Sequence, residues 1–113
     1  EEERRLLERE IGRLVSQGLP LHRMLILSPY RRENSCLSGV VRLRDWPIID
    51  FQSREHGIRF TTIRKFKGLE ADVVFLVDVR DSKACTPADV YVGASRARFM
   101  LYVLHHEEWK RPD

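Results

Sequence analysis

The run VVFLVDV, residues 73–79, decides the fold of this chain. Six of its seven residues are apolar, so the run lacks the alternation of a strand that has one face in water. Uninterrupted apolar strands are typical of parallel sheets in which helices cover both faces. We therefore expect residues 73–79 to form a strand of such a sheet.

Three further runs predict strands on either side of this one. Ile58–Ile63 precedes it in the sequence and Phe99–Leu104 follows it. Met24–Leu27 is a short apolar run that Pro29 ends, and it also has the pattern of a strand buried on both faces.

Two helices are expected to alternate with these strands. In residues 1–17 the apolar side chains recur at steps of three and four, and Gly18 and Pro20 end the pattern. Thr86 is suited to cap a second helix whose first position is a proline, so we expect a helix from Pro87 to about Arg98. Of the remaining segments, Arg31–Leu37 is compatible with a short helix, and Asp45–Asp50 with an irregular connection or an edge strand.

Strands that alternate with helices and loops indicate an α/β domain with an open, mostly parallel sheet. The length of 113 residues fits a single domain, residues 1–113. In such sheets, ligands bind at the carboxyl ends of the strands. The loops after Leu27, Ile63 and Val79 are therefore expected to line the functional edge.

Composition narrows the class of protein. A formal charge of +3 and a pI near 9.1 suit a nucleic-acid partner but are common among other proteins. Cys36 and Cys85 lack the spacing of a zinc or redox site, and the four histidines show no metal-ligand spacing, so no metal site is expected. The chain has no long apolar segment and starts without methionine, and we expect a cytoplasmic piece of a longer chain with no membrane partner.

Two segments carry a family resemblance. They are TTIRKFKGLEADVV, residues 61–74, and YVGASRAR, residues 91–98. In order and spacing they resemble motifs V and VI of superfamily 1 helicases, the UvrD/Rep-like and Upf1-like ATP-driven translocases on nucleic acid. The resemblance covers about residues 24–104. No G-x-x-x-x-G-K-[ST] phosphate loop occurs anywhere in the sequence, so the chain resembles only the second of the family's two RecA-like domains.

The resemblance implies a three-layer RecA-like fold, of the P-loop NTPase type. It also implies a C-terminal helicase domain that closes over ATP and Mg²⁺, both bound mainly by a missing N-terminal RecA-like domain. The expected partners are that domain of the same parent and single-stranded DNA or RNA. The isolated fragment is expected to be inactive, because the phosphate loop is absent from it.

By resemblance, Arg96 matches the arginine that contacts the γ-phosphate. Stabilising a phosphoryl-transfer transition state needs fixed positive charge, and a guanidinium supplies it without deprotonating. The alternative is a solvated arginine on the predicted helix. Arg98, expected near the carboxyl end of that helix, is predicted to have a structural role there.

Gly68 and Glu70 match the nucleotide-contacting part of motif V. Gly68 would let the backbone approach a ligand that a side chain would block. Glu70 can accept hydrogen bonds from ribose hydroxyls, and the resemblance implies that contact. The alternative for Glu70 is a carboxylate at the start of a helix.

Thr62 and Arg64 fall where the UvrD-like pattern has a threonine and a histidine that contact single-stranded nucleic acid. Because Arg64 replaces the histidine, the family's geometry does not carry over unchanged. An arginine can hold a phosphate or stack on a base. Lys65 is either a backbone contact of the same strand or an exposed loop lysine.

The segment SPYRREN, residues 28–34, looks like motif IV in its Upf1-like form. Tyr30 could pack near the nucleotide base, and either Arg31 or Arg32 could be a second phosphate-facing arginine. A turn with solvated arginines is the alternative. At the level of the whole chain, the alternative function is a non-catalytic nucleic-acid-binding or interaction module that keeps the helicase fold.

Overall fold

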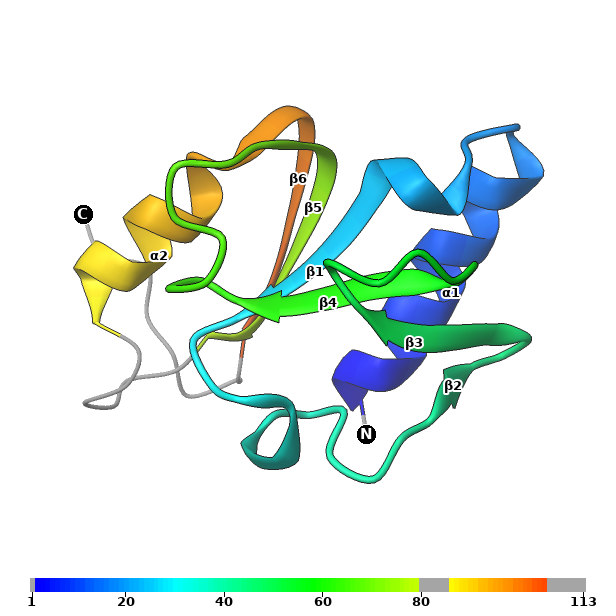
Figure 1. Cartoon of the computed structure of the whole chain (residues 1–113), viewed down its shortest axis with the longest axis horizontal. Coiled ribbons are helices and arrows are strands. Elements are labelled where there is room, and N and C mark those ends of the chain that lie inside the picture. Colours follow the sequence, from blue (N-terminus) through cyan, green and yellow to red (C-terminus); the bar gives the residue numbers. More distant parts are fainter. Residues whose placement is uncertain (1, 80–85, 106–113) are drawn as a thin grey trace.

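The computed structural model describes residues 2–79 and 86–105 (Figure 1). Strand β5 (Ala71–Val79) contains the long apolar run, and its last seven residues are all buried. It pairs in parallel with β1 (Met24–Ser28) on one side and with β6 (Ala97–His105) on the other. The predicted strand at residues 73–79 and its place in a parallel sheet are therefore confirmed.

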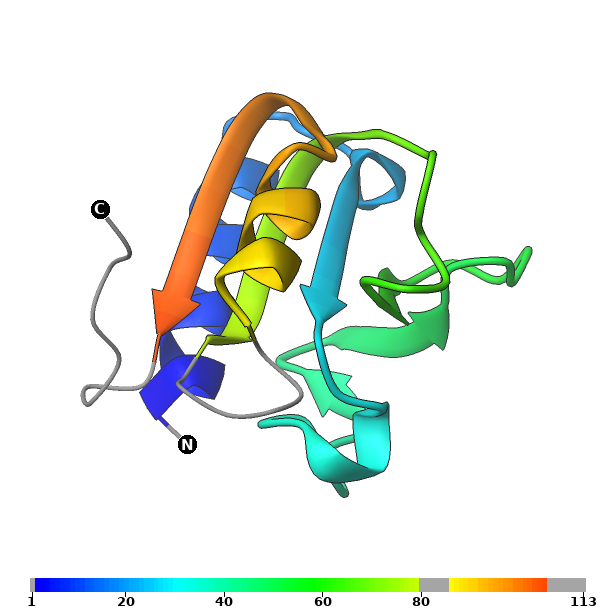
Figure 2. The same cartoon turned by 90° about the vertical axis from the view of Figure 1, so that its left-hand side faces the viewer.

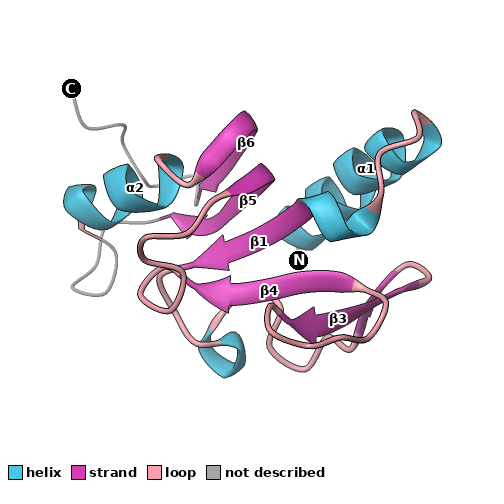
Figure 3. Ribbon diagram, turned by 45° about the horizontal axis from the view of Figure 1, so that its top comes forward, coloured by secondary structure: helices cyan, strands magenta, loops and turns pink. Residues whose placement is uncertain are grey.

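The described residues form a six-stranded sheet in the order β2-β3-β4-β1-β5-β6. Strand β4 (Ile58–Thr62) is parallel to β1, β3 (Trp46–Asp50) is parallel to β4, and only the short β2 (Arg42–Leu43) is antiparallel to its neighbour. The arrowheads of the parallel strands point the same way in Figure 3. The predicted α/β fold with a mostly parallel sheet is confirmed.

One helix covers each face of the sheet, which gives three layers (Figure 2). Helix α1 (Glu2–Ser16) ends as predicted at Gly18, whose φ of 95° allows Leu19 N–H to donate to Leu14 O at 3.0 Å. Helix α2 (Pro87–Ala94) begins at a capping box in which Thr86 and Asp89 each bond the other's backbone N–H.

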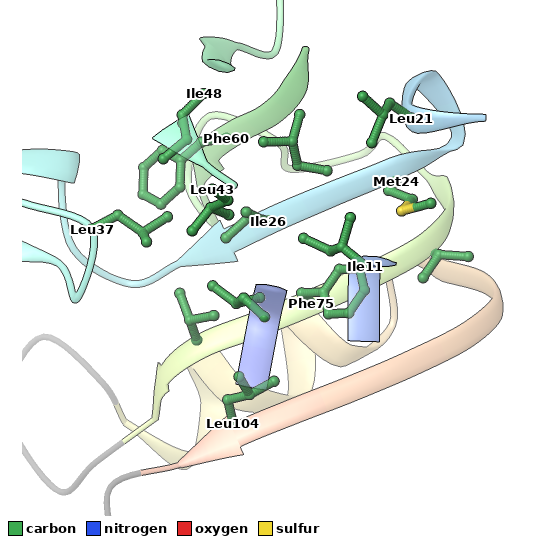
Figure 4. Packing of buried hydrophobic residues seen from close by; sticks show 14 of the residues in the cluster. Ile11, Leu21, Met24, Ile26, Leu37, Leu43, Ile48, Phe60, Phe75 and Leu104 are labelled. Atoms are coloured by element: carbon green, nitrogen blue, oxygen red, sulfur yellow. The ribbon is translucent and has the colours of Figure 1, made fainter. Parts of the chain in front are cut away.

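The larger core lies between α1 and the sheet. Leu7, Ile11 and Leu14 of the helix pack there with Ile26 and Phe75 of the sheet, all of them buried. Figure 4 shows Ile11 and Phe75 pointing toward each other across this layer. The apolar residues predicted at three- and four-residue steps are therefore the helix face that holds α1 on the sheet.

Two short 3-10 helices, Leu21–Arg23 and Arg32–Asn34, flank β1. A short helix was predicted within residues 31–37, and there the structure has the second 3-10 helix followed by turns. The segment 45–50 is a strand next to the edge of the sheet. Among the described residues, neither α-helix is long and apolar enough to cross a membrane.

Helix α2 is shorter than predicted, because it ends at Ala94 and not near Arg98. Ser95 and Arg96 form a turn, and Ala97 already pairs with Ala71 of β5. The Arg96 carbonyl accepts a hydrogen bond from Ala71 N–H at 2.9 Å. Pairing with β5 therefore overrides the helix propensity of alanine and arginine at 96–98.

Candidate functional site

The residues singled out from the sequence lie at two ends of the sheet. One group follows or ends β1 and β4, at their carboxyl ends, and the other precedes β5 and β6, at their amino ends. The carboxyl-end group is Tyr30, Arg31, Arg32, Thr62, Arg64 and Lys65. The amino-end group is Gly68, Glu70 and Arg96.

Strand β1 separates the two groups. Met24 lies beside Val73 of β5 and Ser28 lies at the other end of β1, so the four steps between them span about 13 Å at roughly 3.3 Å per residue. Glu70 lies three residues before Val73, beyond the start of β1. A ligand held by Glu70 and Arg96 is therefore distant from the side chains that follow β1.

At the carboxyl end, a pocket of about 320 Å³ brings together residues from three separate segments. Its lining includes Arg31, Arg32, Thr62 and Lys65, which the sequence placed in two different motifs. Thr62 Oγ1 accepts a hydrogen bond from Lys65 N–H at 3.3 Å, which fixes the turn that follows β4. The side chains of Arg64 and Lys65 are exposed in this turn.

The structure distinguishes the two adjacent arginines. Arg32 is half-buried, and its guanidinium donates to the carbonyls of Val40 and, at 3.4 Å, of Ile48. Arg31 is exposed, and no described residue forms a hydrogen bond or ion pair with its side chain. Arg32 therefore holds the segment before β2 against β3, whereas the charge of Arg31 is available to a ligand.

Tyr30 lies between the end of β1 and the 3-10 helix Arg32–Asn34. Its backbone N–H donates to Ser28 Oγ at 3.0 Å, and Ser28 Oγ donates to Asp78 Oδ2 at 2.6 Å. The half-buried Tyr30 side chain is therefore placed at the carboxyl end of the sheet, distant from Glu70.

At the amino end, Arg96 links helix α2 to the loop before β5. Its Nε donates to Val92 O at 3.2 Å and its Nη1 donates to Leu69 O at 3.3 Å. A guanidinium carries five N–H groups, so three remain for another acceptor. Arg96 thus satisfies a carbonyl at the carboxyl end of α2, the role that the sequence had predicted for Arg98.

Arg98 does not lie on a helix, so its predicted place there is wrong. It is exposed on β6, where its Nε lies 4.0 Å from Asp72 Oδ1 and its guanidinium lies 5.6 Å from the centre of the Phe99 ring. An exposed ion pair of that length contributes little to stability.

Gly68 and Glu70 lie in the loop that carries the chain from the end of β4 back to the start of β5, the green segment beside α2 in Figure 1. Gly68 has φ of 84°, a conformation that glycine adopts without the strain of a side chain. Glu70 precedes a strand, which excludes the alternative of a carboxylate at a helix start. It is exposed and lines a pocket of about 340 Å³ together with Arg23 and Phe66.

A partly buried cluster that the sequence did not predict joins α1, the segment after the second 3-10 helix and β5, with Asp78 buried and Glu3 and Cys36 half-buried. The ligand atoms of Glu3, Cys36 and Asp78 lie within 4.8 Å of one another, the one such set among the described residues with groups able to hold a metal ion. Burial raises the pKa of Glu3 above 4.5, and the charge of Asp78 adds to the increase. Burial also raises the pKa of the Cys36 thiol, which favours its protonated form. Glu3 and Cys36 are 33 residues apart in the sequence and Cys36 and Asp78 are 42 residues apart. Motif spacing therefore could not predict the cluster.

Residues 57–104 match the family model of the UvrD-like helicase C-terminal domain. The match starts just before β4 and ends in β6, so it contains Thr62, Glu70 and Arg96 but neither β1 nor the arginines after it. It supports a helicase C-terminal domain over this part of the chain. The Upf1-like form of residues 28–34 lies outside the match and stays a prediction. A comparison with the curated proteins found no match.

Proposed function

We propose that this chain is the C-terminal RecA-like domain of an ATP-dependent superfamily 1 helicase. The observation that carries the proposal is the family match over residues 57–104, together with the three-layer parallel fold. Within the matched segment, Arg96 and Glu70 lie at the same end of the sheet, and the hydrogen bond from Arg96 to Leu69 O joins their two segments. One ligand could therefore contact both.

Arg96 is suited to the role of an arginine finger. Its two hydrogen bonds to carbonyls hold the guanidinium in place before any ligand arrives, and three N–H groups remain for phosphate oxygens. A positively charged group that is already oriented stabilises the charge of a transition state without reorganising. ATP and Mg²⁺ would be held mainly by an N-terminal RecA-like domain of the parent, and Arg96 would reach the γ-phosphate across the interface.

Glu70 supplies the complementary contact. It is exposed at the mouth of the amino-end pocket, and an ionised carboxylate accepts hydrogen bonds from hydroxyls while it repels phosphates. It would therefore bind the ribose of the nucleotide, and Gly68 beside it leaves the backbone open to a close approach.

The turn after β4 provides the contact with single-stranded nucleic acid. Arg64 and Lys65 present exposed cations next to Thr62, whose hydroxyl keeps its proton for donation because its oxygen accepts from Lys65 N–H. Closure of the two domains over ATP would then move this turn relative to the strand.

A non-catalytic binding module is the second candidate. The hydrogen bonds of Arg96 within the domain favour it, because they give this arginine a structural use that needs no ATP.

The test of the proposed function is phosphate release by the full-length parent with and without a single-stranded oligonucleotide. A helicase domain predicts ATP turnover that rises when the strand is added, and no turnover above a matched blank for residues 1–113 alone. A parent that binds the strand without hydrolysing ATP would support the binding module and contradict the motor.

A further inference from the structure

The pocket at the carboxyl end of the sheet is not used by the proposed nucleotide contacts, because neither Glu70 nor Arg96 lines it. It lies where β3 and β4 end and where the chain leaves β1, and it has a volume of about 320 Å³. Strands β3 and β4 lie on one side of β1 and β5 lies on its other side, so the pocket lies on the β4 side of β1. Open α/β sheets bind ligands at the carboxyl ends of their parallel strands.

Cationic groups outnumber carboxylates by one in the lining. Three cations (Arg31, Arg32 and Lys65) and two carboxylates (Glu33 and Asp50) surround the pocket, which leaves a net charge of +1. The Arg32 guanidinium already donates hydrogen bonds to backbone carbonyls. The Asp50 carboxylate accepts a hydrogen bond from Gln52 N–H at 3.1 Å. The side chains of Arg31 and Lys65 have no partner among the described residues, so they are available to an anion.

Two adjacent threonines of β4 line the pocket. Thr61 lines it, is 3% exposed, and its Oγ1 has no hydrogen-bond partner among the described residues. Thr62 Oγ1 accepts from Lys65 N–H and so presents its own proton outward. The Thr61 oxygen has less than 1 Å² of accessible surface, so of these two hydroxyls that of the half-buried Thr62 is the one a ligand in the pocket can reach.

The position of the pocket favours a backbone phosphate of nucleic acid over a phosphate of the bound nucleotide. Glu70 and Arg96 lie beyond the opposite end of β1, about 13 Å or more away along the strand, so the nucleotide that they would hold does not reach Arg31. Arg64 continues the exposed cationic surface on the same turn as Lys65. A chain of regularly spaced phosphates fits this arrangement better than a single nucleotide does.

We propose that Arg31, Thr62 and Lys65 hold one backbone phosphate of the single strand, and that Arg31 is a nucleic-acid contact and not a nucleotide contact. The proposal rests on the proposed function for the identity of the strand. It also changes the role of Arg31, which by motif resemblance was a candidate contact of the ATP phosphates.

The experiment measures two affinities of the full-length parent: for a fluorescent single-stranded oligonucleotide at several salt concentrations, and for a fluorescent ATP analogue. The variants are Arg31→Ala, Lys65→Ala and the double variant. Arg9→Ala is the matched control, because it removes an exposed arginine of α1 that does not line the pocket. Thermal melting confirms that each variant is folded.

Arg31→Ala is expected to weaken oligonucleotide binding about 5- to 10-fold and to reduce the slope of log K against log salt by about 0.7, the value for one phosphate on a single strand. Affinity for the ATP analogue should stay within about twofold. Because both side chains would hold one phosphate, the loss in the double variant should be smaller than the product of the two single losses.

Loss of affinity for the ATP analogue with unchanged oligonucleotide binding would overturn the proposal and return Arg31 to the nucleotide. An unchanged salt slope in both single variants would also overturn it. If the parent binds the strand through Arg31 but hydrolyses no ATP, the pocket stands and the proposed motor function fails.

Discussion

At the scale of single residues, Arg96 combines a structural and a proposed catalytic role. Its two hydrogen bonds tie α2 to the loop before β5, whereas Arg98 has one long, exposed ion pair. We expect Arg96→Ala to lower the free energy of unfolding by about 1–2 kcal/mol, the sum of two ordinary hydrogen bonds. Arg98→Ala should cost about 0.5 kcal/mol or less.

Urea unfolding of the two variants and the wild-type chain measures both values. The opposite order, with Arg98→Ala the more destabilising, would show that the helix carboxyl end does not depend on Arg96.

Glu3 gives a prediction about pH. Burial raises its pKa in the folded state, so the folded chain keeps the proton at a pH where the unfolded chain has released it. The contribution of protonated Glu3 to stability is complete below pH 4.5 and is lost as the pH rises through the folded pKa. Asp78 and Cys36 face the carboxyl group from the other two segments of the cluster.

Glu3→Gln removes the charge and keeps the shape of the side chain. We expect its melting temperature to exceed that of the wild type at pH 7, and the difference to disappear below about pH 4.5. Thermal melts across this range measure it, and a constant difference at every pH would contradict the assignment.

The sequence alone could not separate Arg31 from Arg32. The two residues are identical and adjacent, and only the carbonyls of Val40 and Ile48, brought there by the fold, distinguish them. In the same way, the pairing of Glu3 with Asp78 depends on how α1 packs on the sheet.

At the scale of elements, the buried strands and α1 could be predicted because their patterns are local. The length of α2 could not, because its last turn competes with pairing to β5, which is a contact between distant segments. Strand β3 was ambiguous for a related reason. Pro47 argued against a central strand, yet it lies near the start of β3 opposite the short, antiparallel β2.

Gly57, in the connection between β3 and β4, is buried against β3. A Cβ there would lie against the carbonyl oxygen of Pro47 and 3.0 Å from Cγ2 of Ile49, so backbone would have to move. We expect Gly57→Ala to destabilise the fold by about 1–3 kcal/mol, the usual cost of overpacking.

Gly12→Ala is the matched control, measured by the same urea unfolding. Its Cβ would meet the end of the Arg44 side chain, which can move, and alanine favours the helix interior by about 1 kcal/mol. The control should therefore be neutral or stabilising. A neutral Gly57→Ala would show that the β3–β4 contact is looser than the structure indicates.

At the scale of the whole molecule, the parallel sheet divides the candidate residues between its two ends. The sequence correctly placed the loops after Leu27 and Ile63 at the carboxyl end, and the third predicted loop, after Val79, lies outside the described residues. Because β4 and β5 run in the same direction, the second loop returns to the amino end of the sheet and carries Gly68 and Glu70 there, away from Thr62. Local sequence patterns were enough to predict the fold class. Which site residues lie together could be determined only from the order and direction of the strands.

The central claim is that this domain completes an ATP site which another domain begins. The most direct measurement is strand-stimulated ATP turnover by the full-length parent and its Arg96→Ala variant, together with their affinities for ATP, below the melting temperature of both. We expect turnover to fall by about 10³-fold or more while ATP affinity stays within about threefold, because Arg96 acts on the transition state. Arg98→Ala should leave turnover within about threefold. If folded Arg96→Ala keeps turnover within tenfold of the wild type, Arg96 is only a structural residue and the account of a shared ATP site is contradicted.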